Sequence, residues 1–150
     1  MDYLIRPCVE DDLPALILLC EKHAAYENAF YQSSGKEALL SAALFGDKPK
    51  LFCIVAESTD GLIGYASYTF DFSTWNAANF LHLDCLYLEP EFRGHGIGGS
   101  FIKILKDIAV QHGCTELQWQ TPLTNQRAIK FYKRMHATGK EKMRFSLEPE

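Results

Sequence analysis

Four of the ten glycines in this 150-residue chain fall within one short stretch, at Gly94, Gly96, Gly98 and Gly99. The stretch from Arg93 to Ser100 lies between a strand predicted at Phe80 to Leu88 and a helix whose apolar face starts at Phe101. Glycine lets the backbone curve tightly, and the amides at the start of a helix carry the positive end of its dipole. The stretch is therefore predicted to bind a phosphate or pyrophosphate, with Arg93 as a charged donor.

The spacing of apolar residues elsewhere predicts a mixed α/β domain. Strands are expected at 3–6, 51–57, 62–72, 80–88, 117–121 and 142–147. Helices are expected from Asp11 to Glu27, over 36–45, from the glycine stretch to near Gly113, and over 125–135. No repeat, linker or low-complexity tract divides the chain, so residues 1–150 are expected to form a single domain.

Composition excludes several classes of protein. The chain has 47% hydrophobic and 23% charged residues and a formal net charge of -4, which is typical of a globular protein and compatible with a cationic substrate. No segment approaches the roughly 20 apolar residues of a membrane span, and we expect no signal peptide, because the first six residues lack its hydrophobic stretch. Five widely spaced cysteines without a CxxC pair favour reduced thiols. We therefore expect a cytoplasmic protein with no membrane or nucleic-acid partner.

Two other kinds of phosphate loop match the glycine stretch poorly. Gly94, Gly96 and Gly99 fit the GxGxxG dinucleotide pattern, but the glycines do not follow directly on the strand, and no acid ends the next strand. The chain after the loop is also too short for a doubly wound sheet. A nucleoside-triphosphate loop would close with Gly-Lys-Ser or Gly-Lys-Thr, which is absent.

The stretch resembles the pyrophosphate signature of the GNAT superfamily of acetyl-CoA-dependent N-acetyltransferases, through Arg93-x-x-Gly96-x-Gly98. The preceding segment, Leu83 to Phe92, is similar to that superfamily's central strand. A second cofactor motif is matched by Asn125-x-x-Ala128-x-x-Phe131-Tyr132. The resemblance covers essentially the whole chain. It implies a central, twisted, mixed and mostly antiparallel sheet of six to seven strands with about four helices, and acetyl-CoA as cosubstrate.

Within the superfamily, the chain most resembles the diamine (spermidine/spermine) and thialysine acetyltransferases. The resemblance is carried by Ala25-Tyr26-Glu27, Gly64-Tyr65-Ala66-Ser67-Tyr68, Trp75 and Phe131-Tyr132-Lys133-Arg134. It implies cofactor contacts at Leu86, Tyr87, Leu88, Arg93, Gly94, His95, Gly96, Ile97, Gly98, Gly99, Ser100, Asn125, Ala128 and Tyr132. It implies a substrate site at Tyr26, Glu27, Trp75 and Asp84, and it leaves a homodimer open.

Two positions depart from the family pattern. Cys85 stands where relatives often carry a second acid, which weakens the case for a polyamine substrate. His136 stands where a glycine is usual, four residues after Tyr132, which questions the backbone after the last helix.

Acetyl transfer to an amine needs a proton acceptor for the ammonium, a donor to the developing oxyanion and an acid for the leaving thiolate. Tyr132 is the predicted acid, and a splayed strand near Leu86 is the predicted source of the oxyanion donor. Asp84 is the leading candidate for the base, with His82 as its rival. Strict alternation would place both on one strand face with Leu86, with Cys85 turned away from Asp84.

The sequence therefore predicts an N-acetyltransferase that acts by direct amine attack on a small di- or polyamine or basic amino acid. Cys85 lacks an evident activating partner, so no acyl-enzyme is expected. No histidine has partners at metal-ligand spacing, so no metal is assigned. A non-catalytic acyl-CoA-binding module of the same fold, or a protein or peptide N-acetyltransferase, are the alternatives.

Overall fold

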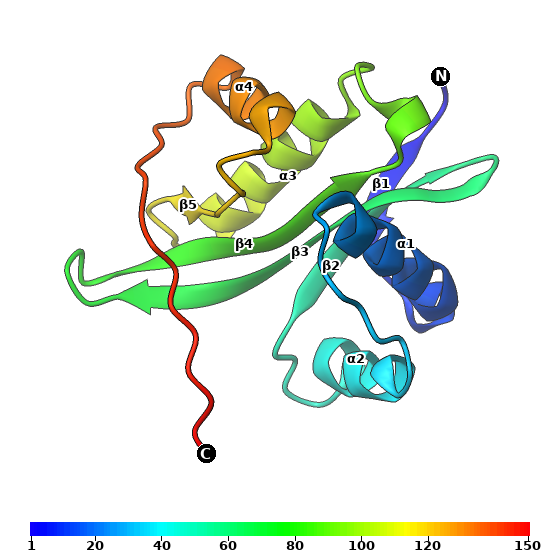
Figure 1. The fold of residues 1–150 in the computed structure, drawn as a ribbon, viewed down its shortest axis with the longest axis horizontal. Coiled ribbons are helices and arrows are strands. Elements are labelled where there is room, and N and C mark those ends of the chain that lie inside the picture. Colours follow the sequence, from blue (N-terminus) through cyan, green and yellow to red (C-terminus); the bar gives the residue numbers. More distant parts are fainter. The chain divides into compact units, whose positions relative to one another are not determined.

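A five-stranded sheet in the order β1-β2-β3-β4-β5 organises residues 1–119. The strands are β1 (Leu4–Pro7), β2 (Phe52–Ser58), β3 (Gly61–Ser73), β4 (Ala78–Leu88) and β5 (Leu117–Gln118). Neighbours from β1 to β4 pair antiparallel, and β5 pairs parallel to β4. The computed structural model describes all 150 residues (Figure 1). The mixed, mostly antiparallel sheet predicted from the sequence is confirmed.

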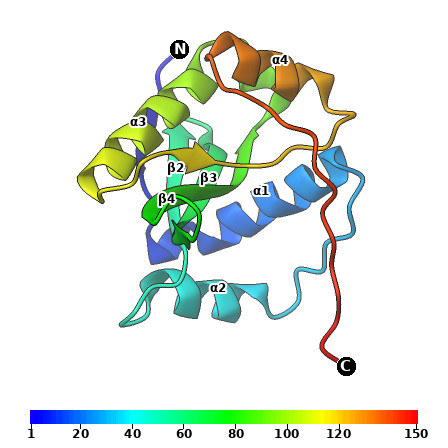
Figure 2. The same cartoon turned by 90° about the vertical axis from the view of Figure 1, so that its left-hand side faces the viewer.

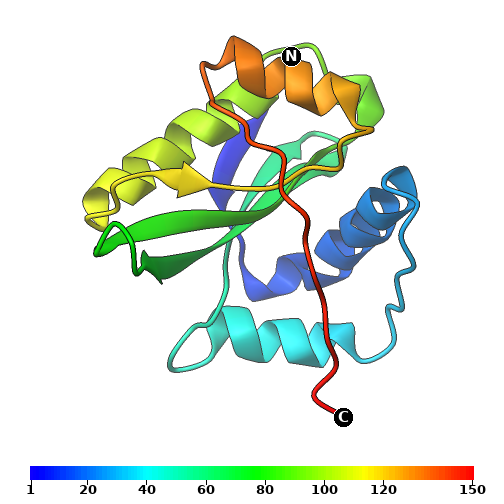
Figure 3. The same ribbon diagram turned by 60° about the vertical axis from the view of Figure 1, so that its left-hand side comes forward.

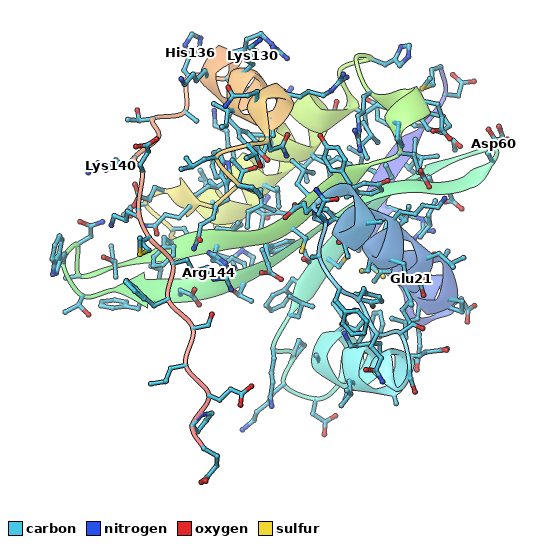
Figure 4. The ribbon with its side chains drawn as sticks, viewed as in Figure 1. Glu21, Asp60, Lys130, His136, Lys140 and Arg144 are labelled. Carbon is cyan, nitrogen blue, oxygen red and sulfur yellow. The ribbon has the colours of Figure 1, made fainter.

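Three α-helices cover the two faces of this sheet (Figures 1 and 2). Helices α1 (Leu13–Tyr26) and α2 (Lys36–Phe45) lie on one face, and α3 (Ile97–Gln111) lies on the other. Two short 3-10 helices, Glu10–Asp12 and Pro90–Phe92, precede α1 and the glycine loop. The helix predicted over 36–45 is confirmed at those bounds, and so is the hairpin turn between β2 and β3, with Asp60 at its tip (Figure 4).

Apolar burial fixes these helices on the sheet. On α1, Leu13, Leu16 and Leu19 pack in one cluster with Val55, Tyr65 and Tyr87 of the strands. On α3, the fully buried residues recur every fourth position, at Ile97, Phe101 and Leu105. The start of α3, and with it the glycine loop, is thereby anchored beside the end of β4.

Residues 120–150 form a second unit that contains α4 (Gln126–Arg134) and the segment after it. The strand predicted at 142–147 is absent, so the sheet has five strands rather than six to seven. That segment runs without regular structure to the C-terminus (Figure 3). Its alternating apolar residues, Met143, Phe145 and Leu147, are 77%, 83% and 96% exposed. Alternation alone makes no strand, because a strand needs a hydrogen-bonded neighbour.

No helix in the structure combines the length and the apolar character needed to cross a lipid bilayer.

Candidate active site

The glycine loop has the backbone geometry of an anion site. Gly94 and Gly96 take left-handed φ values of 81° and 83°, and a Cβ on either would meet no atom within 4 Å. Ser100 makes the first helical hydrogen bond of α3, from its N–H to the Gly96 carbonyl. The amides of residues 97–99 thus open the helix without a helical acceptor. Such a helix start suits an anion such as a pyrophosphate.

Side chains at the ends of the loop hold it in place. The Nε of Arg93 donates to the Leu88 carbonyl at 2.8 Å, and its guanidinium lies 4.6 Å and 5.4 Å from the ring centres of Tyr26 and Tyr87. The Ser100 hydroxyl contacts the Tyr3 hydroxyl at 2.9 Å and donates to the Gly96 carbonyl at 3.2 Å. Arg93 therefore joins the loop to the end of α1, where two of the predicted substrate residues lie.

A β-bulge interrupts β4 at Asp84. Ser67 of β3 pairs with Cys85, but the next residue, Tyr68, pairs with Leu83, so Asp84 has no partner opposite it. Directly opposed residues share a face of the sheet, and successive residues along a strand point to opposite faces. The prediction of strict alternation is therefore wrong beyond Asp84: Leu86 lies on the α3 face, whereas Cys85 joins the α1 cluster.

The bulge also decides which backbone groups of β4 reach its outer edge. Before the bulge, the Leu81 N–H donates outward to Glu116; after it, the Glu89 N–H donates inward to Ile63 of β3. The carbonyl of Leu88 points outward to Arg93, so the backbone groups of Leu86, two residues earlier, point to the same edge. Because β5 pairs with β4 only at Leu81 and His82, it does not pair with this edge at Leu86. The backbone of Tyr87 faces β3 instead.

Asp84 is exposed, and its close neighbour is the thiol of Cys85, with Sγ 3.8 Å from Oδ2. No hydrogen bond or ion pair joins it to His82. The expectation that Cys85 turns away from Asp84 is wrong, because the bulge brings the two side chains to the same face. Burial, with the charge of Asp84 beside it, raises the pKa of the Cys85 thiol to about 11. The thiol is therefore protonated near pH 7 and is a poor nucleophile.

A histidine that the sequence analysis gave no role lies between the carboxylate of Glu27 and the strands that carry Asp84. His23 of α1 contacts the Tyr65 hydroxyl through Nδ1 at 2.9 Å and the Glu27 carboxylate through Nε2 at 2.8 Å. Cys85 lies diagonally across from Tyr65 on the same face of the sheet and packs against the same cluster, so its thiol influences the Tyr65 hydroxyl. Asp84, Cys85, Tyr65, His23 and Glu27 are thus a series of neighbouring side chains, which we call the polar chain. The separation of four residues between His23 and Glu27 was the available sequence signal.

Glu89 comes directly after β4, beside Pro90. It is buried, and its carboxylate pairs with Lys22 of α1. The ion pair raises the pKa of Lys22 and gives the buried carboxylate the partner that it needs. It adds a second tie between α1 and the end of β4.

Trp75 lies apart from the acids of the predicted substrate site. It sits in the turn between β3 and β4 and is 97% exposed. Tyr26 and Glu27, by contrast, end α1 beside Arg93 and His23. The first unit therefore gathers Tyr26, Glu27 and Asp84 through Arg93 and the polar chain, and leaves Trp75 outside this network.

The remaining predicted residues belong to α4 in the second unit. The Asn125 side chain accepts a hydrogen bond from the Ala128 N–H at 3.2 Å and caps the helix. Tyr132 lies beside Phe131, with ring centres 5.3 Å apart. His136 takes a left-handed φ of 66°, and the N–H of Ala137 donates to the Tyr132 carbonyl. A helix ending of this kind usually has glycine at the left-handed position. His136 adopts that conformation, so the change from glycine to histidine leaves the backbone after α4 in the usual form.

No group of three or more His, Cys, Asp or Glu side chains in the structure could hold a metal ion.

Comparison with known proteins identifies a family whose members match most of this chain. The model of the acetyltransferase (GNAT) family matches residues 9–137. A thialysine N-epsilon-acetyltransferase of Bos taurus is 35% identical, over 89% of this chain and 83% of that protein. The human spermidine/spermine N(1)-acetyltransferase-like protein 1 is 31% identical, over 88% of this chain and 20% of that protein. An integron cassette protein from the mobile metagenome of V. cholerae superposes with a TM-score of 0.78 at 28% identity, covering 97% and 93% of the two chains.

Proposed function

Because this chain belongs to the acetyltransferase (GNAT) family and is an N-acetyltransferase, we propose that it acetylates a small primary amine that carries a second positive charge. Membership confirms the resemblance found in the glycine stretch, and the thialysine and spermidine/spermine relatives match the branch predicted. The proposed acceptors are di- or polyamines and basic amino acids. The observation that carries this proposal is the polar chain, in which neighbouring side chains of the first unit run from the carboxylate of Glu27 to that of Asp84.

Acetyl-CoA is the proposed cosubstrate and supplies the acetyl group. The glycine loop and the start of α3 suit its pyrophosphate, and the outward backbone groups of Leu86 suit the thioester end. The full set of proposed contacts is Leu86, Tyr87, Leu88, Arg93, Gly94, His95, Gly96, Ile97, Gly98, Gly99, Ser100, Asn125, Ala128 and Tyr132.

The remaining proposed roles concern protons and the acceptor. Asp84 accepts the proton of the reacting ammonium through water, with His82 as the alternative acceptor. Tyr132 donates a proton to the departing thiolate. Glu27 binds the distal ammonium beside Tyr26, and Trp75 is a proposed cation-π contact.

The experiment that tests the function is an acetyl-CoA consumption screen over putrescine, polyamines, thialysine, lysine, butylamine, aminoglycosides and peptides. We expect turnover of acceptors with two positive charges to exceed that of butylamine. Activity confined to neutral amines or peptides would contradict the proposed acceptor. Coenzyme A binding without turnover of any amine would instead indicate a non-catalytic module.

Replacing Glu27 by Gln is expected to raise KM for putrescine roughly tenfold or more, because a hydrogen bond to a charged group contributes about 1.5–3 kcal/mol. KM for butylamine, which lacks the second amino group, should change far less. Glu21→Gln is the matched control, since Glu21 is an exposed acid on the same helix (Figure 4). Equal effects on KM for the two amines would show that Glu27 does not bind the distal ammonium.

Replacing Asp84 by Asn is expected to lower kcat by roughly tenfold and to flatten the rise of kcat with pH. The loss is modest for a general base because Asp84 is exposed, so water and buffer partly replace it. His82→Gln, measured in parallel, distinguishes the two candidate bases. A larger loss of kcat in His82→Gln than in Asp84→Asn would assign the proton acceptor to His82.

We extend the proposal to the whole molecule. Residues 1–150 are proposed to act as one domain, which the family match over residues 9–137 supports. A cytoplasmic location and a homodimer complete the proposal, and light scattering on the purified protein tests the latter.

A further inference from the structure

His23 is held at both ring nitrogens, and its two partners fix how it can carry protons. An ionised carboxylate only accepts hydrogen bonds, so Nε2 must donate to Glu27. Neutral His23 therefore has its proton on Nε2, and Nδ1 accepts from the Tyr65 hydroxyl. Protonated His23 donates from both nitrogens, and the Tyr65 hydroxyl then accepts from Nδ1 and turns its own hydrogen toward the side where Cys20 and Cys85 pack. Both protonation states thus satisfy the same contacts.

The groups that face His23 come from three elements. Glu27 is the residue that follows α1, the helix of His23 itself; Tyr65 lies on β3, and the Tyr87 ring of β4 stacks on the imidazole with ring centres 5.2 Å apart. Burial raises the pKa of both tyrosines, so neither ionises near neutral pH. Glu27 is accordingly the ionised group in direct contact with the imidazole.

The ionisable groups that lie beyond these direct neighbours are neutral, paired with another group or farther from His23. Burial raises the pKa of the Cys20 and Cys85 thiols, which stay neutral behind Tyr65. Arg93 lies over the Tyr87 ring, and Lys22 is paired with the buried Glu89. Asp84 closes the polar chain beyond Cys85. A proton taken up by His23 is therefore compensated chiefly by Glu27.

Glu27 itself has a reason to bind a cation. It follows directly on α1, where the helix dipole places its negative end, and a carboxylate there is disfavoured unless a positive charge lies nearby. Its side chain is 35% exposed and that of His23 is 14% exposed, so a ligand can approach Glu27 from the side that His23 does not cover. Two cations can thus compensate Glu27: an ammonium group from outside or the protonated imidazole from inside.

We propose that His23 is a positioning residue that makes binding of the charged acceptor depend on pH through Glu27. Neutral His23 orients the Glu27 carboxylate and leaves its negative charge to the distal ammonium of the acceptor. Protonated His23 forms an ion pair with Glu27 and competes with that ammonium. The inference rests on the proposed function, in which Glu27 binds the second positive charge of the substrate.

Thermodynamic linkage gives the proposal a direct signature, because a proton that weakens acceptor binding must itself be released when the acceptor binds. Histidine is the side chain that changes charge between about pH 5 and 8. Putrescine keeps both charges over that range, so its own protonation does not contribute. We expect its Kd for the enzyme with coenzyme A to weaken roughly threefold to tenfold from about pH 8 to about pH 6.

Calorimetric titration of putrescine at about pH 6, in two buffers that differ in ionisation enthalpy, measures the protons released. The wild-type protein should release a substantial fraction of a proton, and His23→Gln should release close to none. Glutamine is chosen because its amide can still donate to Glu27 and accept from Tyr65 while it stays uncharged. The matched control is His112→Gln. His112 follows α3, and its Nδ1 contacts the Ile108 carbonyl at 2.9 Å, so this variant should release protons as the wild type does.

A second measurement needs no variant. The NMR titration of the His23 ring in the wild-type protein should move to lower pH when saturating putrescine is added. An unchanged His23 titration, or undiminished proton release in a folded His23→Gln protein, would overturn the inference. The amine screen decides the proposed function separately, since turnover of putrescine establishes the acceptor whatever His23 does.

Discussion

Replacing Tyr132 by Phe is expected to lower turnover by roughly 10²-fold or more while coenzyme A binds as before. The phenol is the proposed proton donor to the departing thiolate, and Phe keeps the ring that lies beside Phe131. The helix should be unaffected, because its cap at Asn125 and its ending at His136 do not use the Tyr132 hydroxyl. Single-turnover kinetics with saturating putrescine and acetyl-CoA is the required measurement, since it isolates the chemical step.

Tyr31→Phe is the control for Tyr132→Phe, because it also removes one phenol hydroxyl from the protein. Tyr31 lies in the connection between α1 and α2, and the ammonium group of Lys36 lies over its ring. Burial raises the pKa of Tyr31 to about 12. Its chemical step should match the wild type within about twofold. If Tyr132→Phe also turned over at the wild-type rate, another group would have to protonate the thiolate.

Replacing Gly96 by Asp is expected to weaken coenzyme A binding by roughly 10²-fold or more. Gly96 has a left-handed φ of 83°, and the space where a Cβ would stand is open in the structure. That space is the proposed position of the pyrophosphate, so the new carboxylate would bring like charges together at the start of α3. Calorimetry with coenzyme A measures the loss directly.

The backbone cost of Gly96→Asp needs its own control. Gly61, the first residue of β3 after the hairpin turn, also has a positive φ, 101°, with open space at the Cβ position. Gly61→Asp should therefore destabilise the fold to a similar extent and leave coenzyme A affinity unchanged. Loss of affinity in both variants would point to unfolding instead of a phosphate site.

Local signals in the sequence predicted most of the helices and strands and the glycine loop. Glycines with positive φ, an apolar residue every fourth position in α3 and the Asp-Gly turn between β2 and β3 each act within a few residues, so the sequence displays them. The segment at 142–147 shows the limit of such signals. Its alternation is as regular as that of a strand, but strand formation depends on a neighbour that no local pattern specifies.

The errors within the site have a different physical origin. A bulge changes the face of every later residue in β4, and the apolar residues on both sides of Asp84 suit either face, so the change left no signal. His23 gained its role from Tyr65, which is distant in the sequence and close in the fold. The family motifs placed Asp84 and Glu27 individually, but the contacts that join them are tertiary.

Asp84 is best understood as an insertion into a strand that does not need it. Its neighbours, Leu83 and Cys85, pair with the consecutive residues Tyr68 and Ser67, so β4 without Asp84 would form an unbroken ladder with the same partners. The outward direction of Leu86 would also be kept, because alternation from Leu83 through Cys85 leads to it. Sheet regularity and chemistry are therefore opposed at this one position: losing the residue would make the strand more regular and remove the proposed base. Selection for stability alone would favour the regular strand, and the proposed role of Asp84 as the base would account for its presence.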